Sequence, residues 1–320
     1  MPEASSPSES LGGRTCVTSV FHQPVLVRET ADMLVHDSTG IYVDATIGGG
    51  GHAQEILSRL TTGRLIGLDC DPEAIGWCRE HLRGEFLLLQ ARFSQMQEVV
   101  APLTPSGIQG VLFDLGVSSH QLDHPQRGFS YRQDGLLDLR MDPTISRTAA
   151  DIVNELPPNE LSRLISSHGE EPQASRIAKA IARARAQAPI RTTMQLASII
   201  AQSVPAAGVK ALARTFQALR IAVNSELEEL AMGLDSAWRL LAPGGHLIVL
   251  TYHSLEAKVV KSFFASKIRG CVCPPNLPIC GCGRHGQAIG LTRKATGPSP
   301  AEISGNPRAR SARLRGLKRL

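Results

Sequence analysis

The sequence predicts an α/β protein in which a helical segment interrupts a parallel, doubly wound sheet. Apolar runs of strand length alternate with helical patterns at the start of the chain, which is typical of parallel sheets. Four consecutive glycines follow the first predicted strand, and an acidic residue ends the second. The strand pattern is then missing from most of residues 120 to 245 and resumes at His246.

The first predicted strand begins at Ile41 and runs into the glycines of residues 48 to 51. Glycines without a Cβ let the backbone turn sharply and approach a ligand closely. The helix that follows has Ala53, Ile56 and Leu57 on one face and points its positive end at the turn. This arrangement favours a nucleotide-like cofactor.

The second strand, Arg64 to Leu68, ends in Asp69, 18 residues beyond Gly51. An acid at this place in α/β folds binds ribose hydroxyls. The order of strand, glycine loop, helix, strand and acid therefore supports a cofactor site over an ordinary tight turn with a surface Asp. The pattern Gly48-x-Gly50-x-x-Ala53 also matches the dinucleotide fingerprint, so an NAD-dependent oxidoreductase is one alternative.

The remaining elements follow from periodicity and breakers. Further buried strands are predicted at Glu85 to Gln90, at Val111 to Phe113 before Asp114, and at His246 to Thr251. Between the last two, residues 157 to 242 are almost wholly helical in pattern, with breaks at Pro172, Pro189 and Pro205. A helix over Leu255 to Phe264 follows the last strand.

Composition indicates a cytoplasmic protein with more than one domain. The chain has 320 residues, of which 42% are hydrophobic and 20% charged. No apolar run reaches the length of a membrane span, and residues 1–20 read as a disordered leader without a signal core. Seven cysteines, an odd and partly scattered set, argue against a disulfide framework and for a reducing compartment.

The chain resembles the bacterial 16S ribosomal RNA (cytosine-N4)-methyltransferases, the RsmH/MraW family, from about His22 to Leu320. Many long motifs in the same order carry this resemblance. They are His22 to Leu26, Gly48 to His52, Asp114 to Ser119, Gln121 to Asp123, Arg127 to Ser130, Leu137 to Pro143, Arg214 to Arg220, Val223 to Leu227, His253 to Glu256 and Asn306 to Ser311.

The resemblance implies a Rossmann-like class I sheet that binds S-adenosylmethionine, the methyl donor, and carries an inserted helical domain. The substrate would be the exocyclic N4 of a cytidine in the decoding region of 16S rRNA, so the partner would be the small ribosomal subunit. The expected domains are the leader (1–20), a first methyltransferase part (21–137), a helical domain for substrate recognition (138–214) and a second methyltransferase part (215–320). The second part would contain a Cys-rich loop (271–285) and a basic C-terminus.

The resemblance also assigns cofactor positions. Gly50, Gly51 and His52 would line the methionine and ribose end, and Asp69 would bind the ribose hydroxyls. Phe93 would pack beside the adenine, and Asp114 with Gln121 would complete the pocket near the transferable methyl. Most of these residues follow strand ends, where open α/β sheets bind ligands.

The catalytic group is not identified by sequence. The N4 amine is a poor nucleophile, and it needs a hydrogen-bond acceptor and in-line placement against the methyl. Amino methyltransferases that act on DNA often use an Asp/Asn/Ser-Pro-Pro-aromatic turn, whereas Leu115-Gly116-Val117 follows Asp114 here. This difference disfavours a DNA substrate. The candidates are Asp114, Ser118, Ser119 and the end of the fifth strand, Tyr252, His253 and Ser254. A structural role is the alternative for His253.

A zinc site in the Cys-rich loop is a weak candidate. Its ligands would be Cys271, Cys273, Cys280 and Cys282. Cys-x-Cys is tighter than the usual Cys-x-x-Cys, and the related family needs no metal, so we expect reduced thiols and no metal.

Charge is concentrated at the C-terminus. The net charge is +5, and residues 284 to 320 hold nine basic residues and one acid. Such a segment suits a polyanion such as RNA, although a solvated tail is the alternative. A second basic group, Arg176, Lys179, Arg183 and Arg185, lies in the helical insertion and would face the RNA or solvent. A non-catalytic ribosome-assembly factor that binds S-adenosylmethionine fits the same features, and the chain could be a monomer or a homodimer.

Overall fold

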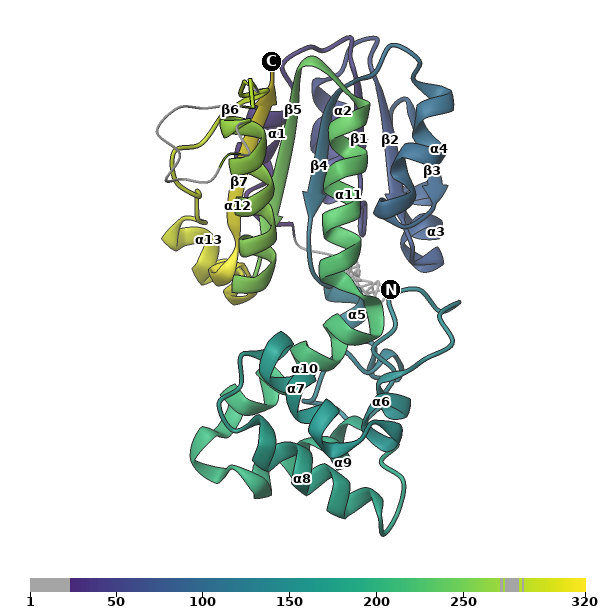
Figure 1. Ribbon diagram of the computed structural model, residues 1–320. Helices are drawn as coiled ribbons and strands as arrows, with labels where there is room; N and C mark the ends of the chain where they lie inside the picture. Colours follow the sequence, from purple (N-terminus) through teal and green to yellow (C-terminus); the bar gives the residue numbers. More distant parts are fainter. Residues whose placement is uncertain (1–23, 271–272, 274–281, 284) are drawn as a thin grey trace, which may run out of the picture.

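The computed structural model describes residues 24–270, 273, 282–283 and 285–320, and its centre is a seven-stranded sheet (Figure 1). The predicted leader and most of the Cys-rich loop, with Cys271 and Cys280, lie outside these residues. The strand order is β3-β2-β1-β4-β5-β7-β6. The strands are β1 (Ile41–Asp44), β2 (Arg64–Asp69), β3 (Phe86–Gln90), β4 (Ile108–Asp114), β5 (Leu241–Thr251), β6 (Ala288–Gly290) and β7 (Arg313–Arg319).

The sheet is doubly wound, as the sequence predicts. Strand β1 pairs in parallel with both β2 and β4, so the winding direction reverses between β1 and β4. One face is covered by α1 (Val27–Leu34), α2 (Gly51–Arg59) and α3 (Pro72–His81), and the other by α4 (Met96–Val100), α11 (Glu226–Leu240) and α12 (Ser254–Arg269). A ligand site is expected at the carboxyl ends of these strands, next to the reversal.

The C-terminus is a strand and not a tail, which corrects the sequence interpretation. Strand β7 runs antiparallel to β5 and β6 and lies between them, so the sheet is mixed. Leu314 and Leu317 on β7 are fully buried, and the Arg319 guanidinium donates to the carbonyls of Trp238 (2.9 Å) and Leu241. Because basic residues outnumber the leucines in residues 313–319, the sequence pattern did not indicate a strand there.

The helical insertion forms a second core at the carboxyl end of the sheet (Figure 1). It contains α6 (Ala149–Glu155), α7 (Pro158–Gly169), α8 (Ala174–Arg185), α9 (Thr193–Ser203) and α10 (Gly208–Asn224). Pro172, Pro189 and Pro205 fall between these helices, as predicted. The buried members of this core run from Phe129 to Val223, a wider span than the 138–214 expected for the insertion.

A sharp junction joins the helical part to the sheet. Helix α10 ends at Asn224, and Ser225 adopts a left-handed conformation (φ 50°) before α11 begins. The Asn224 side chain donates to the carbonyl of Leu139 (2.8 Å) and accepts from the amide of Met141 (2.8 Å). The junction is therefore anchored to the loop that enters the helical part.

Within the described residues, no single helix has the length and apolar composition of a membrane span. In the part of the chain that the structure describes, α9 and the segment Pro205–Asn224 reach that length and composition when taken together, as a pair bent by 105°.

Candidate active site

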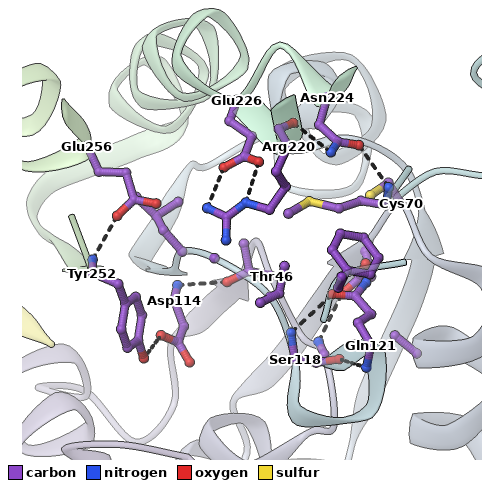
Figure 2. Close-up of a pocket in the computed structure, with 18 of the residues that line it drawn as sticks. Thr46, Cys70, Asp114, Ser118, Gln121, Arg220, Asn224, Glu226, Tyr252 and Glu256 are labelled. Atoms are coloured by element: carbon purple, nitrogen blue, oxygen red, sulfur yellow. Dashed lines mark hydrogen bonds and ion pairs between the residues drawn. The ribbon is translucent and has the colours of Figure 1, made fainter. Parts of the chain in front are cut away.

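A cavity of about 410 Å³ lies at the carboxyl ends of β1, β2, β4 and β5, against the helical part (Figure 2). This volume lies within the range typical of small-molecule sites. Of the predicted site residues, Gly51, His52, Asp69, Phe93, Asp114, Ser118, Gln121 and His253 line it. Gly50 lies in the turn directly behind the wall, and the side chain of Ser119 is outside the described part of the chain.

The glycine loop permits close approach of the backbone. Gly48 (φ 48°) and Gly50 (φ 77°) have left-handed conformations that favour glycine. A Cβ on Gly51 would lie 2.5 Å from Cγ of Pro24, so no side chain fits there. Gly50 shapes the turn as the N-cap of α2, while Gly51 presents its backbone to the cavity.

Asp69 is oriented by two backbone amides. Its Oδ2 accepts from the N–H of Gly48 (2.9 Å), and its Oδ1 accepts from the N–H of Asp71 (2.9 Å). Burial raises the pKa of Asp69 to about 6, while these hydrogen bonds oppose the rise. Above that pH the carboxylate is ionised and has lone pairs left for two hydroxyl donors, which fits the predicted ribose contact.

Phe93 is packed in the cavity wall. Its ring meets Phe113 edge to face, with centroids 5.6 Å apart. Gly233 on α11 leaves the space for this ring, because a Cβ there would lie 2.6 Å from Phe93 Cδ2. A fixed aromatic face in the cavity suits a planar adenine.

Asp114, at the end of β4, contacts Thr46 and Tyr252 (Figure 2) and lies close to His52. The Tyr252 hydroxyl donates to its Oδ1 (2.7 Å), and His52 Nδ1 lies 3.5 Å from its Oδ2. Its own N–H donates to Thr46 Oγ1 (2.7 Å). Burial and the charge of Asp114 raise the pKa of Tyr252, so the phenol keeps its proton and stays a donor.

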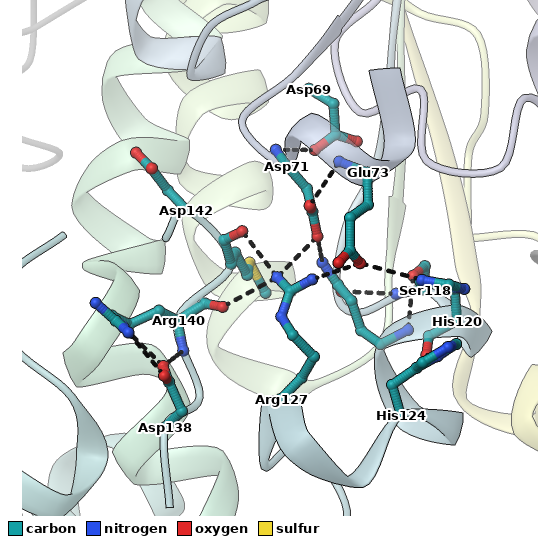
Figure 3. A network of polar contacts seen from close by, with 12 residues as sticks. Asp69, Asp71, Glu73, Ser118, His120, His124, Arg127, Asp138, Arg140 and Asp142 are labelled. Atoms are coloured by element: carbon teal, nitrogen blue, oxygen red, sulfur yellow. Dashed lines mark hydrogen bonds and ion pairs between the residues drawn. The ribbon is translucent and has the colours of Figure 1, made fainter. Parts of the chain in front are cut away.

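Ser118 and Gln121 form a capping box at the start of α5 (Ser119–Asp123). The Gln121 Nε2 donates to Asp71 Oδ2 (2.9 Å), which also accepts from Arg127 (2.8 Å) (Figure 3). Arg127 further contacts Glu73 (2.9 Å). These bonds connect α5 to the loop that carries Asp69, which favours a positioning role for Gln121.

His253 is the N-cap of α12 and forms a capping box with Glu256. Its Nε2 lies 3.1 Å from Glu256 Oε1, and the Tyr252 N–H donates to Glu256 Oε2 (2.7 Å). Burial favours the neutral acid, but hydrogen bonds and charge from His253, with the Arg220 charge, lower the pKa of Glu256. The geometry favours the structural alternative for His253 over a general base.

Sequence reasoning gave no role to several cavity residues. They are Tyr131, Phe216, Arg220 and Glu226. Arg220 and Glu226 fall inside quoted motifs, but their pairing depends on the left-handed turn at Ser225, which no local pattern reveals. Among the described residues, Glu226, His253 and Glu256 have ligand-type atoms within 4.8 Å of one another, and the Arg220 guanidinium supplies positive charge beside them.

The basic residues of α8 lie away from this cavity. Arg176, Lys179 and Arg183 are exposed, and none of the lining residues described above belongs to α8. The Arg185 guanidinium donates to the carbonyls of Val153 (2.6 Å) and Leu156 (2.7 Å), so it caps the end of α6. Arg185 therefore has a structural role, contrary to the RNA-facing role considered from sequence.

The doubly wound sheet, with its glycine loop, an acid after β2 and an acid after β4, places the protein in the class of Rossmann-like class I methyltransferases. Residues 19–320 match the model of the MraW methylase family, so the chain belongs to that family. It is 48% identical over 307 residues to a protein of Symbiobacterium thermophilum, covering 93% of this chain and 96% of that one. It is 45% identical over 311 residues to a protein of Heliobacterium modesticaldum, covering 94% and 99%. Both relatives are named ribosomal RNA small subunit methyltransferase H.

Proposed function

We propose that this protein methylates the exocyclic N4 of a cytidine in the decoding region of 16S rRNA, with S-adenosylmethionine as the donor. Family membership and the names of full-length relatives support a small-subunit rRNA substrate. The observation that carries the proposal is one continuous cavity that reaches from the glycine loop and Asp69 to Asp114 and on to the helical part.

The residues of the first half of the cavity fit the donor. Gly51 offers backbone without a side chain, Asp69 offers a carboxylate for the ribose, and Phe93 offers a ring for the adenine. When bound, S-adenosylmethionine supplies an electrophilic methyl group on a positively charged sulfur, which leaves as the thioether when N4 takes the methyl. His52 and Asp114, at the end of β4, also line the cavity.

Asp114 is the group that we assign to the amine. A carboxylate that accepts a hydrogen bond from N4–H draws the amine into position and stabilises the positive charge that develops as the N–C bond forms. It is also the acceptor for the proton that the methylated amine then loses. The Tyr252 hydroxyl on Oδ1 and His52 Nδ1 beside Oδ2 hold the carboxylate in one orientation, so little reorganisation is needed during the reaction. The Ser118 side chain caps the N-terminus of α5 by accepting from the Gln121 N–H. Asp114 is therefore the strongest of the candidates.

The test is nucleoside mass spectrometry of 16S rRNA from cells with and without the gene. N4-methylcytidine should be present with the gene, absent without it, and restored by the wild-type gene but not by Asp114→Asn. A non-catalytic assembly factor would leave the modification unchanged, and a DNA methyltransferase would change DNA and not rRNA. The proposal also places the protein in the cytoplasm, where ribosomal subunits are assembled.

A further inference from the structure

The half of the cavity that faces the helical part contains an ion pair that the reaction steps above do not use. Arg220 on α10 contacts Glu226 on α11 through two parallel hydrogen bonds, Nε to Oε1 (2.7 Å) and Nη2 to Oε2 (2.9 Å). The two side chains are only 16% and 12% exposed, and both line the cavity. A bidentate pair of this kind fixes the guanidinium plane.

The fixed plane directs the free edge of the guanidinium into the cavity. In Figure 2 the Arg220 guanidinium extends below Glu226 toward Thr46 and Asp114. Among the described residues, its Nη1 makes no hydrogen bond, since both bonds to Glu226 come from Nε and Nη2. The site therefore presents a donor edge to the cavity that Asp114 also lines.

A hydrogen-bond acceptor, Asp114, and a hydrogen-bond donor, Arg220, in the same cavity can pair with one edge of cytosine. Cytosine has donors at N4 and acceptors at N3 and O2 along one edge, whereas uracil has an acceptor at position 4 and a donor at N3. We propose, on the basis of the proposed function, that Arg220, positioned by Glu226, donates to the N3/O2 edge and selects cytosine while Asp114 accepts from N4. A uracil in the same place would direct its N3–H donor at the Arg220 donor and its O4 acceptor at the Asp114 acceptor.

The cavity also supplies aromatic surface for a base removed from its stack. Tyr131 and Phe216 both line the helical side, with ring centroids 5.4 Å apart. Sequence-specific RNA recognition uses such rings to hold unstacked bases, together with hydrogen bonds to their edges. Phe216 and Arg220 lie one helical turn apart on α10, so this helix presents both an apolar and a polar contact to the base.

The experiment measures how strongly the protein prefers cytidine over uridine at the target position, in addition to its activity. The substrate is small ribosomal subunits that lack the modification, and the enzyme is the full-length protein. The competitor is the same subunits with the target cytidine changed to uridine. For the wild type, the uridine subunits should inhibit with a constant at least about 10-fold above the KM of cytidine subunits. For Arg220→Lys, which keeps the charge but loses the planar fork, this ratio should fall toward one.

Arg214→Lys is the matched control. Arg214 lies on the same helix and pairs with Glu171 (3.4 Å), but it is 44% exposed and not in the cavity wall. For Arg214→Lys, the ratio of the uridine-subunit inhibition constant to the cytidine-subunit KM should equal that of the wild type. Affinity for S-adenosylmethionine should be the same in all three proteins, and all three should be folded at the assay temperature.

Two results would overturn the inference. An unchanged discrimination ratio in Arg220→Lys would make the pair purely structural, and a loss of S-adenosylmethionine affinity would place Arg220 on the donor. If Arg220→Lys does not fold, Glu226→Gln, which frees the guanidinium to rotate, should lower the ratio instead, and no change would be equally decisive. Failure of the wild type to methylate cytidine subunits would instead disprove the proposed function, and the inference with it.

Discussion

At the residue scale, Asp69 is a buried carboxyl group that must be ionised to accept hydrogen bonds from the ribose hydroxyls of S-adenosylmethionine. Its pKa of about 6 means that the carboxylate is largely ionised at neutral pH and protonated at pH 5. Because the ionised form accepts from hydroxyls, affinity for S-adenosylmethionine should rise as the pH increases through 6. Asp69→Ala should lower affinity at pH 7.5 by about 10- to 100-fold, corresponding to about 1.5–3 kcal/mol, and remove this pH dependence. Calorimetry from pH 5 to 8 measures both, and equal affinity in the two proteins would contradict the assignment.

Asp44, buried beneath the cavity at the end of β1, should affect stability. Burial, with the charges of Asp114 and Asp69, raises its pKa to about 8. The folded protein then keeps a proton that the unfolded chain loses near its ordinary pKa of 3.8, so the free energy of unfolding falls as the pH rises toward 8. The slope is at most about 1.4 kcal/mol per pH unit.

Asp44→Asn, which resembles the protonated acid, should remove this slope. Urea denaturation of the ligand-free protein between pH 6.5 and 8 separates the effect of Asp44 from that of Asp69, whose titration is mostly complete by then. The variant should gain stability relative to the wild type as the pH rises. Parallel profiles would show that Asp44 is ionised throughout.

At the element scale, Arg127 connects the loop after α5 to the N-terminus of α3 (Figure 3). It pairs with Asp71, which is 3% exposed, and through Asp71 it supports the amide that orients Asp69. Arg127→Ala leaves a buried carboxylate without its cation, which should cost about 3 kcal/mol of unfolding free energy and weaken S-adenosylmethionine binding. Arg64→Ala is the control, since Arg64 and Glu85 are both more than half exposed and neither lines the cavity, and such pairs contribute less than about 1 kcal/mol. Similar losses in the two variants would argue against a role for Arg127 in the cofactor loop.

Strand β7 changes which basic residues are expected to contact RNA. Lys318 and Arg319 are half-buried in the sheet, whereas Arg310 and Arg313, the first residue of β7, are exposed and line a shallow cleft beside Tyr252 and His253. Replacing Arg310 and Arg313 with Ala should raise the KM for subunits and reduce the salt dependence of binding by about 0.7–0.9 log units per lost phosphate contact. Arg319→Ala should lower the melting temperature and leave the salt dependence unchanged. Equal salt slopes for the wild type and the double variant would show that the RNA is bound elsewhere.

At the scale of the whole molecule, the sequence predicted the features that depend on chain order. The glycine loop, Asp69 and Asp114 follow apolar strands, and parallel strands bring their carboxyl ends to one edge. The sequence did not predict features that depend on distant pairing. Arg220 meets Glu226 only across the left-handed turn at Ser225. Strand β7 was concealed because its polar residues outnumber its leucines.

The two parts of the molecule meet at the α10–α11 junction, and Asn224 controls this contact. Its side chain is 6% exposed and bonds to Leu139, Met141 and the carbonyl of Arg220 (2.9 Å). Asn224→Ala removes the side-chain partner of the Leu139 carbonyl and of the Met141 N–H, at a cost of about 1–3 kcal/mol for each. Because Asn224 ties the end of α10, which carries Arg220, to this loop, the variant should also lower kcat/KM for ribosomal subunits. Affinity for S-adenosylmethionine should change little, since Gly51, Asp69 and Phe93 come from the other side of the cavity.

Asn154→Ala separates this effect from general destabilisation. Asn154 makes a comparable set of bonds, to Ala150 (2.8 Å) and in both directions to Ile190 (2.8 and 3.0 Å), but wholly inside the helical part. Both variants should unfold at lower urea concentrations, and only Asn224→Ala should lose turnover at temperatures where both are folded. If both lose turnover equally, the helical part acts as one rigid unit and the junction has no separate role. If neither does, the base-reading side of the cavity is oriented by contacts other than Asn224.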